Sequence, residues 1–423
     1  MWLGIYTLLY YLGAGISLPK EFLKRPPKIR GKWLKDKLAI FPTIFSEKEM
    51  IWIHAVSVGE VVAVSKLVKK LSKRYDILLS TITDTGQKVA KEKFKDLPVK
   101  TIYLPLDCPF AIKRTLKAFK PKALLIAETE LWPNLIVTAS KHVPVFLING
   151  RLSEKSFKNY QKVKFFIKSI LDCLSFIAVQ EEVYKDRFKA LGVSDNKIFV
   201  TGNTKFDIEI KEIDFFWEKY LIKPIIIAGS THFPEEELIT KSFLKLDNSA
   251  TLLIVPRHPE RFDEVENTIK GLIKGYAETG FFRLTSAYIN KKDLNNFKKL
   301  IILVDKMGIL GSLYRICDIA IIGGSFIPHG GQNPLEAIYW KKPIIFGPSM
   351  ENFPFVKEFL EKKACIQSDK ESLFYHLKNL IEDKKLQKDL GKRAYQIFKT
   401  KSGVTEKILK LLDKYGLSIS ESD

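Results

Sequence analysis

The stretch IAIIGGSFIPHGGQNPLE, residues 319–336, decides the fold of the second half of this chain. Its first four residues are apolar, as in a strand buried on both faces, and a glycine-rich loop follows. Asn333 is a natural helix N-cap and Pro334 suits a first helical position, so the stretch predicts a strand, a loop and a helix start. Glycines allow a close backbone approach and a helix start offers unpaired N–H groups. We therefore expect a seat for a phosphate here, far from the N-terminal position of a dinucleotide-binding loop.

Short apolar runs like residues 319–322 recur along the chain. The runs expected to be strands are 51–56, 76–83, 101–106, 123–128, 143–148, 176–180, 197–202, 224–230, 251–257, 300–305, 319–324 and 343–348. They lack strict alternation, which indicates parallel strands covered on both faces, and amphipathic stretches such as 61–75 separate them. The pattern predicts an α/β protein with two doubly wound, Rossmann-like domains.

The domain limits follow from where the strand signal fades. We predict an N-terminal α/β domain at 38–208 and a C-terminal α/β domain at 223–401. The charged stretch 209–222 is expected to link them. Residues 402–423 are expected to form a C-terminal amphipathic helix and tail.

The N-terminus differs in composition from the remaining chain. Residues 1–18 carry no charged side chain, and residues 20–37 then carry eight Lys or Arg and two acidic residues. Eighteen helical residues span about 27 Å, which is marginal for a bilayer core. Positive charge after the apolar run predicts a membrane anchor at 1–18 and a basic juxtamembrane segment at 19–37, with the later domains in the cytoplasm. An interfacial helix held to anionic lipid is the alternative.

The net charge of the chain indicates which kinds of binding partner are favoured. The 423 residues carry a formal charge of +21, which favours anionic ligands such as nucleic acid, anionic lipid or a phosphorylated substrate. A lysine-rich solvated surface is the plain alternative. The four cysteines are scattered with no C-x-x-C pair, as in a reduced cytoplasmic protein.

In the predicted N-terminal domain, polar side chains follow several strands. Glu60 ends HAVSVGE (54–60), with Ser57 and Gly59 in the same loop, and a carboxylate there can act as a general base. A helix-start carboxylate that gains only about 0.3–1 kcal/mol from the macrodipole is the alternative.

Two further motifs of this domain follow strands. ETELWPN (128–134) contributes Glu128 and Glu130, although spacing alone favours a capped turn with a buried tryptophan. NGRLSEKS (149–156) contributes Arg151, a cation suited to a carboxylate or phosphate.

The predicted C-terminal domain carries candidate phosphate contacts. Ser230 and Thr231 follow its first strand and Arg257 its second. Glu336 could accept a hydrogen bond from a ribose hydroxyl or, alternatively, form a capping box with Asn333. No Asp-x-Asp occurs, so a metal-held nucleotide diphosphate is not indicated and we expect no metal and no cofactor.

Together, HAVSVGE, ETELWPN, NGRLSEKSF, GNTKFD (202–207), AGSTH (228–232), VPRHPERF (255–262) and GGSFIPHGGQNPLEA (323–337) resemble the 3-deoxy-D-manno-octulosonic acid (Kdo) transferases of lipopolysaccharide synthesis. The resemblance implies a GT-B fold, with two domains facing a cleft, and transfer of Kdo from CMP-Kdo to the lipid A precursor lipid IVA. It implies that Glu60 is the general base. The residues implied to bind CMP are Ser230, Thr231, Arg257, Met307, Gly308, Asn333 and Glu336. Those implied on the acceptor side or in the cleft are Ser57, Gly59, Glu128, Glu130, Asn149 and Arg151.

Three positions depart from the family pattern. Gly150 stands where alanine is usual, Thr83–Gly86 read Thr-Asp-Thr-Gly instead of Thr-Pro-Thr-Gly, and Lys306 replaces a threonine.

The resemblance implies an inverting, metal-independent enzyme on the cytoplasmic side of the inner membrane. Its partners would be CMP-Kdo, lipid IVA and the anionic membrane surface, with no nucleic acid. Other classes remain open. A nucleic-acid binder would explain the charge, and a dinucleotide-dependent oxidoreductase would need a G-x-G-x-x-G that residues 54–60 lack. A GT-B enzyme using a UDP-sugar is the nearest alternative.

Overall fold

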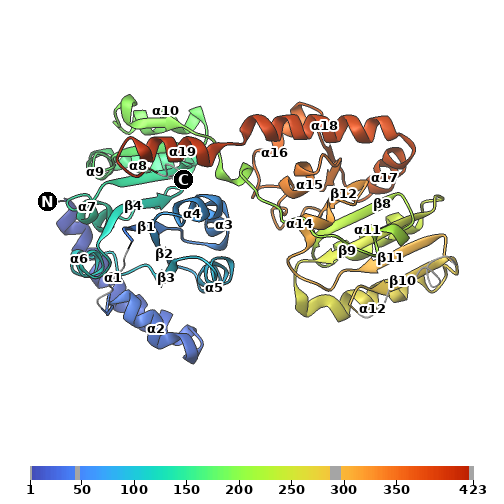
Figure 1. Cartoon of the computed structure of the whole chain (residues 1–423), viewed down its shortest axis with the longest axis horizontal. Helices are drawn as coiled ribbons and strands as arrows, with labels where there is room; N and C mark the ends of the chain where they lie inside the picture. Colours follow the sequence, from blue (N-terminus) through green and yellow to red (C-terminus); the bar gives the residue numbers. More distant parts are fainter. Residues whose placement is uncertain (1, 43–47, 286–296, 419–423) are drawn as a thin grey trace. The chain divides into compact units, whose positions relative to one another are not determined.

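The computed structural model describes residues 2–42, 48–285 and 297–418, and the chain divides into two compact units (Figure 1). Unit 1 runs to Asp207 and resumes at Lys401, whereas unit 2 is Ile208–Thr400. Each unit has a seven-stranded parallel sheet between layers of helices, so the predicted pair of doubly wound α/β domains is confirmed.

The sheet of unit 1 has the strand order β3-β2-β1-β4-β5-β6-β7, and all of its pairs are parallel. The strands are β1 Met50–His54, β2 Asp76–Thr81, β3 Val99–Tyr103, β4 Pro121–Ala127, β5 Val145–Gly150, β6 Phe176–Val179 and β7 Ile198–Val200. Successive side chains point to opposite faces. In β1, Trp52 therefore lies in one core cluster, and Ile51 and Ile53 lie in the other.

Helices of unit 1 precede and separate these strands. They are α1 Trp2–Lys24, α2 Pro27–Lys37, α3 Val58–Ala63, α4 Ser65–Leu71, α5 Asp84–Lys93, α6 Pro109–Phe119, α7 Pro133–Ala139, α8 Glu154–Lys162, α9 Lys164–Leu171, α10 Glu182–Ala190 and α19 Val404–Asp413. Short 3₁₀ turns occupy η1 Asp195–Lys197 and η2 Thr204–Phe206.

Unit 2 repeats the architecture with the order β10-β11-β9-β8-β12-β13-β14. Its strands are β8 Ile225–Thr231, β9 Ala250–Pro256, β10 Thr279–Arg283, β11 Lys299–Leu303, β12 Ile319–Ile322, β13 Ile344–Phe346 and β14 Ile366–Gln367. Its helices are η3 Glu218–Tyr220, α11 Glu235–Leu244, η4 Pro259–Arg261, α12 Phe262–Ile273, α14 Leu310–Leu313, α15 Leu335–Tyr339, α16 Val356–Glu361, α17 Leu373–Glu382 and α18 Lys384–Lys401.

Two strands of unit 2 were absent from the sequence prediction. β10 and β14 form the two edges of its sheet. β10 is half-buried over its last three residues, and β14 has only two residues. An edge strand is covered less completely than a central one, so neither carries the continuous apolar run on which the prediction depended.

The segment predicted as a linker, residues 209–222, is part of unit 2. Phe215 and Trp217 are buried, and the N–H of Ile213 donates to Ser312 Oγ at 2.8 Å. Arg315 forms an ion pair with Glu218 at 2.9 Å. The buried aromatic residues attach this stretch to unit 2, although its charged residues suggested a solvent-exposed linker.

The C-terminal helix returns to unit 1. Val404, Ile408 and Leu412 of α19 are fully buried in the core cluster that also holds Ile51 and Ile53 of β1. Asp207 fixes the start of this helix, because its carboxylate accepts the N–H groups of residues 403–405. The final helix thus completes the core of the N-terminal unit.

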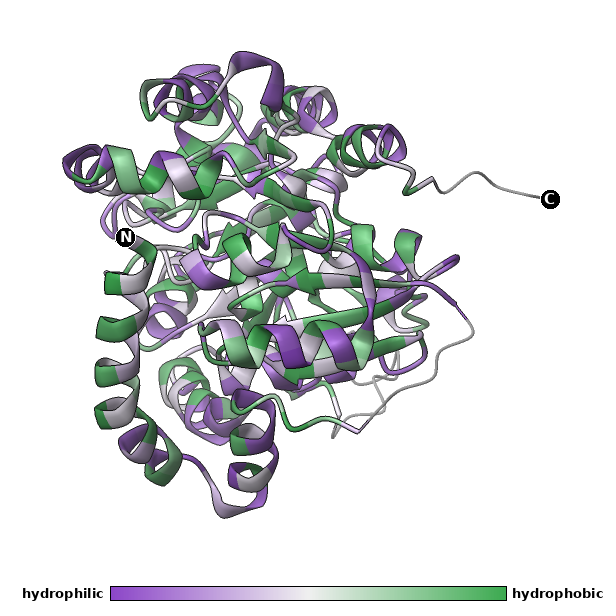
Figure 2. Cartoon of the chain, turned by 90° about the vertical axis from the view of Figure 1, so that its left-hand side faces the viewer, coloured by the Kyte–Doolittle hydropathy of each residue, from purple (hydrophilic) through white to green (hydrophobic). Residues whose placement is uncertain are grey.

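The N-terminal helix is longer and better attached than an isolated anchor at 1–18. α1 continues through Pro19 to Lys24, and Figure 2 shows mostly hydrophobic residues along its outer side. Within the described ranges of the chain, no helix has the length and apolarity needed to cross a membrane. The segment predicted as juxtamembrane, residues 19–37, also packs within unit 1, because Trp33 and Asp36 of α2 are buried.

Candidate functional site

Both sheets have a topological switch point, where ligands of doubly wound folds bind at the carboxyl ends of strands. In unit 1 the chain first adds strands on one side of β1 and then continues on the other side with β4. Glu60 follows β1 and Glu128 follows β4. In unit 2 the equivalent strands are β8 and β12, which precede Ser230 and the glycine-rich loop.

Glu60 lies in the first turn of α3 and is only 8% exposed. Its Oε2 accepts the N–H of Val56 at 2.8 Å, and its Oε1 accepts the hydroxyl of Ser57 at 3.0 Å. Both bonds reach back along the loop, as in a capping box. They hold the carboxylate at the carboxyl edge of the sheet in one orientation.

The electrostatics of Glu60 differ from those of an ordinary capping residue. Burial, together with the charges of Glu128 and Glu130, raises its pKa from 4.5 to about 7, against the opposing effect of the Val56 and Ser57 hydrogen bonds. Burial, with a contribution from Glu128, also raises the pKa of Glu130, whose Oε2 accepts Trp132 Nε1 at 3.1 Å. The three predicted carboxylates therefore share one region, and Glu60 can exchange a proton near neutral pH.

Three of the predicted site residues have left-handed backbone conformations. Glu128, Asn149 and Ser230 have φ of 56°, 55° and 56°. Each ends or directly follows a central strand. Non-glycine residues rarely adopt this conformation, and such strain concentrates at functional sites.

Asn149 and Arg151 differ in their roles. Asn149 is fully buried, and its Oδ1 accepts the N–H of Thr204 at 3.0 Å, which ties the end of β5 to the GNTKFD motif. Its Nδ2 has no hydrogen-bond partner among the described residues. Arg151 is half-buried and forms no ion pair within the described part of the chain. Arg151 is thus the residue available to an anion.

Thr83–Gly86, the N-cap and first turn of α5, support the loop that leads into α3 and Glu60. The N–H of Thr83 donates to Val56 O at 3.2 Å, and Thr83 Oγ1 accepts the N–H of Gly86 at 3.0 Å. A Cβ on Gly86 would lie 3.3 Å from Val56 O. Asp84, at the family's proline position, accepts Arg25 of the N-terminal segment at 3.1 Å.

The two other departures differ in how far the structure explains them. A Cβ on Gly150 would lie 3.3 Å from Ala178 O, so this position tolerates only a very small residue. Nothing in the structure explains Lys306.

In unit 2, the predicted phosphate seat is partly occupied by the protein itself. Glu235, at the start of α11 and 1% exposed, accepts the N–H groups of Gly324, Ser325 and Phe326 at 2.6, 3.0 and 2.9 Å. It also accepts the N–H of His232 at 3.0 Å. A ligand phosphate cannot use these amides, so this part of the prediction is wrong. An internal carboxylate fixes the loop instead.

The helix after the loop also starts later than predicted. α15 has five residues, and Pro334, rather than Asn333, precedes its first residue. Asn333 Oδ1 accepts the N–H of Leu335 at 3.1 Å, so it still organises the turn. Glu336 lies in the first turn, with its Oε2 3.5 Å from the Cβ position of Gly311.

The remaining predicted donor residues lie at the same edge of unit 2. Thr231 is fully buried, and its hydroxyl has no hydrogen-bond partner among the described residues. Arg257 follows β9, is exposed, and its N–H donates to Thr231 O at 3.0 Å. Met307 is 48% exposed, and Gly308 has φ of 81°, which favours glycine. These residues end or follow β8, β9 and β11, so they lie along the carboxyl edge of the sheet.

A histidine cluster in unit 2 was not predicted as a unit. The ring of His232 lies 4.2 Å from that of His329 and 5.2 Å from that of His258. Burial and the neighbouring cations lower the pKa of His232 to about 4, so it is neutral at pH 7. Gln332 Nε2 lies 3.0 Å from its Nε2. Nothing in the spacing of GSTH, RHPER and PHGG along the chain revealed that these rings meet.

Within the described ranges, no group of three or more His, Cys, Asp or Glu side chains is arranged to hold a metal ion.

Solved structures with the same fold include proteins in complex with UDP or a UDP-sugar. The UDP-GlcNAc 2-epimerase of Neisseria meningitidis, bound to UDP-GlcNAc, matches 86% of this chain and 100% of its own, with 13% identity and a TM-score of 0.57. Anabaena Alr3699/HepE, in complex with UDP and glucose, matches 86% and 100%, with 14% identity and a TM-score of 0.52. These likenesses show the fold alone. Two Rossmann-like units, each with polar groups at its switch point, give the protein a GT-B-like fold.

Sequence relatives identify the family. The family model described as 3-deoxy-D-manno-octulosonic-acid transferase matches residues 32–208. The 3-deoxy-D-manno-octulosonic acid transferase of Haemophilus influenzae is 36% identical and covers 86% of this chain and 87% of its own length. A bifunctional glycosyltransferase/methyltransferase of Fusobacterium nucleatum is also 36% identical over 90% of the chain, which spans only 59% of that protein. This chain belongs to the Kdo transferase family, glycosyltransferases of lipopolysaccharide biosynthesis.

Proposed function

We propose that this enzyme transfers Kdo from CMP-Kdo to lipid IVA, with inversion and without a metal ion, at the cytoplasmic face of the inner membrane. The observation that carries the chemistry is Glu60, a buried carboxylate at a switch point whose pKa is raised to about 7. A base of this strength is half ionised near the working pH, where general-base catalysis is most effective.

Glu60 would accept the proton of the acceptor hydroxyl as that oxygen attacks the anomeric carbon of Kdo. The CMP phosphate leaves from the opposite face, so the configuration inverts. The bonds from Val56 and Ser57 keep the carboxylate in place while its charge changes. The negative charges of Glu128 and Glu130 favour uptake of the proton.

Unit 2 would bind the donor. CMP leaves with a single phosphate, and Arg257, which forms no ion pair with a described residue, supplies a cation for it. Ser230 and Thr231 add hydroxyl donors at the end of β8, and Glu336 would accept from the ribose. Because the donor is a monophosphate, these groups can stabilise the leaving group without a metal ion.

Unit 1 would bind the acceptor. Lipid IVA carries phosphates, and Arg151 is a cation without an acidic partner among the described residues at the edge that also holds Glu60. The exposed apolar side of α1 and the basic α2 would place this unit on an anionic membrane surface.

The test is the mass of the product formed by purified enzyme, lipid IVA and a system that generates CMP-Kdo. We expect lipid IVA carrying Kdo, and the number of added residues follows from the same spectrum. CMP should protect the enzyme against thermal unfolding and UDP should not. Protection by UDP alone, with no Kdo product, would indicate a UDP-sugar enzyme instead.

A further inference from the structure

Unit 1 has a large open cavity away from its catalytic edge. Its volume is about 790 Å³, within the range of ligand sites. Pro121, the first residue of β4, helps to line it, so it lies at the amino edge of the sheet, whereas Glu60 and Glu128 lie at the carboxyl edge. Four lysines, one histidine and one residue of α1 are among the residues that line this cavity. They are Lys113, Lys117, Lys120, Lys141, His142 and Leu3.

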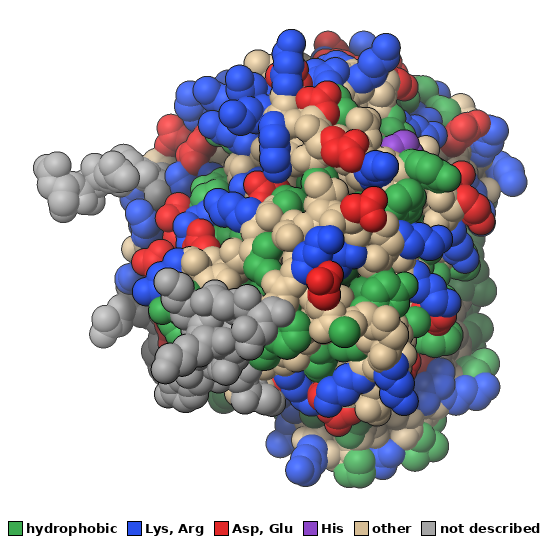
Figure 3. Space-filling model, turned by 90° about the vertical axis from the view of Figure 1, so that its right-hand side faces the viewer, with side chains coloured by type: hydrophobic (Ala, Val, Ile, Leu, Met, Phe, Trp, Pro, Cys, Tyr) green, Lys and Arg blue, Asp and Glu red, His purple; other side chains and the backbone are tan. Residues whose placement is uncertain are grey.

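We call this site the lysine cavity. None of its lining residues is acidic, and none of its four lysines forms an ion pair within the described part of the chain. Other helical lysines are paired one turn away, for example Lys158 with Glu154 at 2.6 Å. On the face drawn in Figure 3, basic and acidic side chains are interspersed. The lysine cavity therefore has a charge excess that the protein does not balance.

Helix dipoles explain only part of this excess. Lys117 lies in the last turn of α6, and Lys141 follows the end of α7, where cations are favoured by about 0.3–1 kcal/mol. Lys113 lies before that last turn and gains nothing from it. Four like charges around one cavity fit a ligand with several anionic oxygens, such as a phosphate group.

The cavity is bounded by α1, and α1 is fixed to unit 1. Tyr6 Oη donates to Asp107 Oδ2 at 2.8 Å, and the N–H of Asp107 donates to Tyr10 Oη at 3.0 Å. Thr7 Oγ1 donates to Asn134 Oδ1 at 3.0 Å. Leu3, on the same helical face, reaches the lysine cavity.

The exposed face of α1 is apolar, and it begins at Trp2, which is 53% exposed and directly precedes Leu3. Leu8, Leu12 and Ile16 are 62%, 60% and 68% exposed and recur at helical spacing. Between α1 and the α8–α9 junction lies a second cavity of about 410 Å³, lined by apolar residues such as Leu9 and Phe165 together with two lysines. An apolar stripe beside cations is the pattern of a helix lying in a membrane interface.

We propose that the lysine cavity binds the phosphate-bearing headgroup of an anionic membrane lipid whose acyl chains lie along the apolar face of α1. The site is separate from the carboxyl edge, where we propose that the substrates bind. The inference rests on the proposed membrane location of the enzyme but not on the chemistry of Kdo transfer. Charge complementarity, together with the exposed apolar residues of α1 that begin at Trp2 beside Leu3, favours a lipid over a free phosphate.

The experiment uses the full chain and sedimentation with vesicles of phosphatidylcholine, with or without phosphatidylglycerol. The test variant is the triple substitution Lys113→Gln, Lys117→Gln and Lys141→Gln. Each lysine near an anionic surface contributes roughly 1 kcal/mol, so we expect affinity for the phosphatidylglycerol vesicles to fall roughly 100-fold. Binding to pure phosphatidylcholine should not change.

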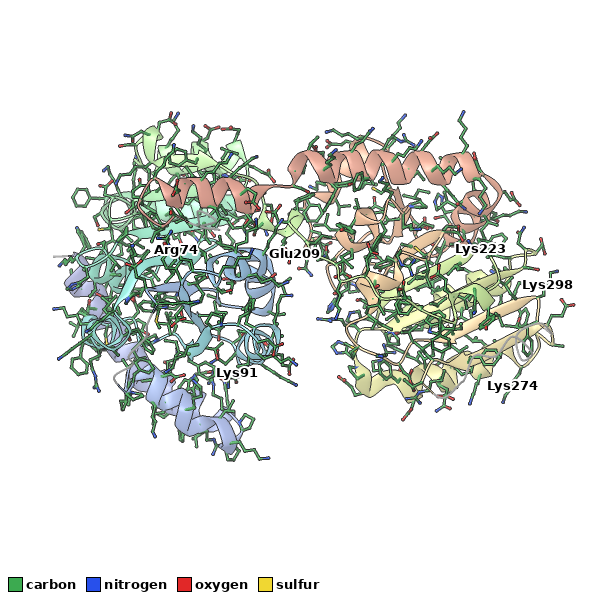
Figure 4. The ribbon with its side chains drawn as sticks, viewed as in Figure 1. Arg74, Lys91, Glu209, Lys223, Lys274 and Lys298 are labelled. Atoms are coloured by element: carbon green, nitrogen blue, oxygen red, sulfur yellow. The ribbon has the colours of Figure 1, made fainter. Side chains whose placement is uncertain are left out.

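The matched control removes the same charge elsewhere. Lys91, Lys274 and Lys298 are exposed and point away from the body of their units (Figure 4). Their triple substitution by glutamine should reduce vesicle affinity less than about 3-fold, because screened charges act only over roughly 10 Å. Equal losses in both variants would overturn the proposal, since total charge alone would then explain binding.

Two further measurements keep the proposal separate from the proposed function. Transfer to detergent-dispersed acceptor should be unchanged in the test variant, and loss there would assign the lysines to the acceptor site instead. Inorganic phosphate should not displace the wild-type protein from vesicles at matched ionic strength. If it does, the cavity binds free phosphate and the lipid assignment is wrong.

Discussion

Replacement of Glu60 by glutamine tests the catalytic role and the electrostatics of this residue at once. The amide keeps the shape of the side chain and can still accept one of the two hydrogen bonds that Val56 and Ser57 donate. It cannot accept a proton. Loss of a general base lowers rates by about 10²–10⁴-fold, so transfer should fall by that factor while CMP binding in unit 2 is retained.

The same substitution should change how stability depends on pH. Glu60 has a pKa of about 7 in the folded chain against an ordinary value of 4.5. This difference amounts to about 3 kcal/mol at 1.36 kcal/mol per pKa unit. Because the folded state holds the proton more tightly, the contribution of Glu60 to stability is complete below pH 4.5 and is lost as the pH rises through 7.

Glutamine has no proton to lose. Between about pH 5 and pH 8, the free energy of unfolding of Glu60→Gln should therefore rise relative to wild type by roughly 2–3 kcal/mol. Urea titrations at each pH measure this difference, and the activity assay supplies a second curve. In the wild type, kcat/KM should increase with pH up to about 7 and then level off.

Glu154→Gln is the matched control, because Glu154 is exposed at the start of α8 and forms an ion pair with Lys158. It should leave transfer unchanged. If Glu60→Gln retains transfer within a few-fold of wild type, Glu60 is not the base. If its relative stability is independent of pH, the carboxyl group is not buried as described.

Three other outcomes are expected. Arg257→Ala and Glu336→Ala should each weaken CMP binding about tenfold or more in titration calorimetry, because one removes a charge-assisted contact and the other a ribose acceptor. Normal affinity in both would remove the donor site from this edge of unit 2. Transfer should persist in EDTA, since the leaving group is a monophosphate, and loss that Mg²⁺ restores would contradict this. Glu235→Gln should raise the KM for CMP-Kdo more than it lowers kcat, because an amide cannot accept all four N–H groups, three from the loop and one from His232. Glu237→Gln, at an exposed helical ion pair, should change neither constant.

The features of the fold that depend on hydrophobic periodicity and on the order of strands along the chain could be predicted from the sequence. Parallel strands buried on both faces show continuous apolar runs, and groups that follow neighbouring strands meet at one edge. For that reason the proximity of Glu60, Glu128 and Glu130 could be predicted. The edge strands β10 and β14 could not, because an edge strand needs no such run.

Glu235 was missed for a different reason. Three consecutive glutamates at the start of a helix look like ordinary partners of the helix dipole. That Glu235 binds a loop about ninety residues later depends on β8 and β12 being neighbours, which single-sequence patterns do not show. With that pairing known, a buried acid beside a glycine-rich loop is the expected arrangement.

The N-terminal helix shows how composition can hide contacts. Its lack of charge suggested an anchor, but Tyr6 and Tyr10, four residues apart, put two hydroxyls on one face. Those hydroxyls meet the buried Asp107. Tyrosines on one face of an otherwise apolar helix were the signal available from the sequence.

The return of α19 to unit 1 has a consequence for how the protein is made. A ribosome releases residues in order, at roughly 5–20 per second, and domains usually fold as they emerge. The core of unit 1 cannot close then, because Val404, Ile408 and Leu412 are translated only after all of unit 2. For about 10–40 s, the nascent N-terminal unit exposes the apolar groove that α19 will fill. Chaperone capture of stalled chains that end near Thr400, but not of chains released at full length, is the expected sign of this delay.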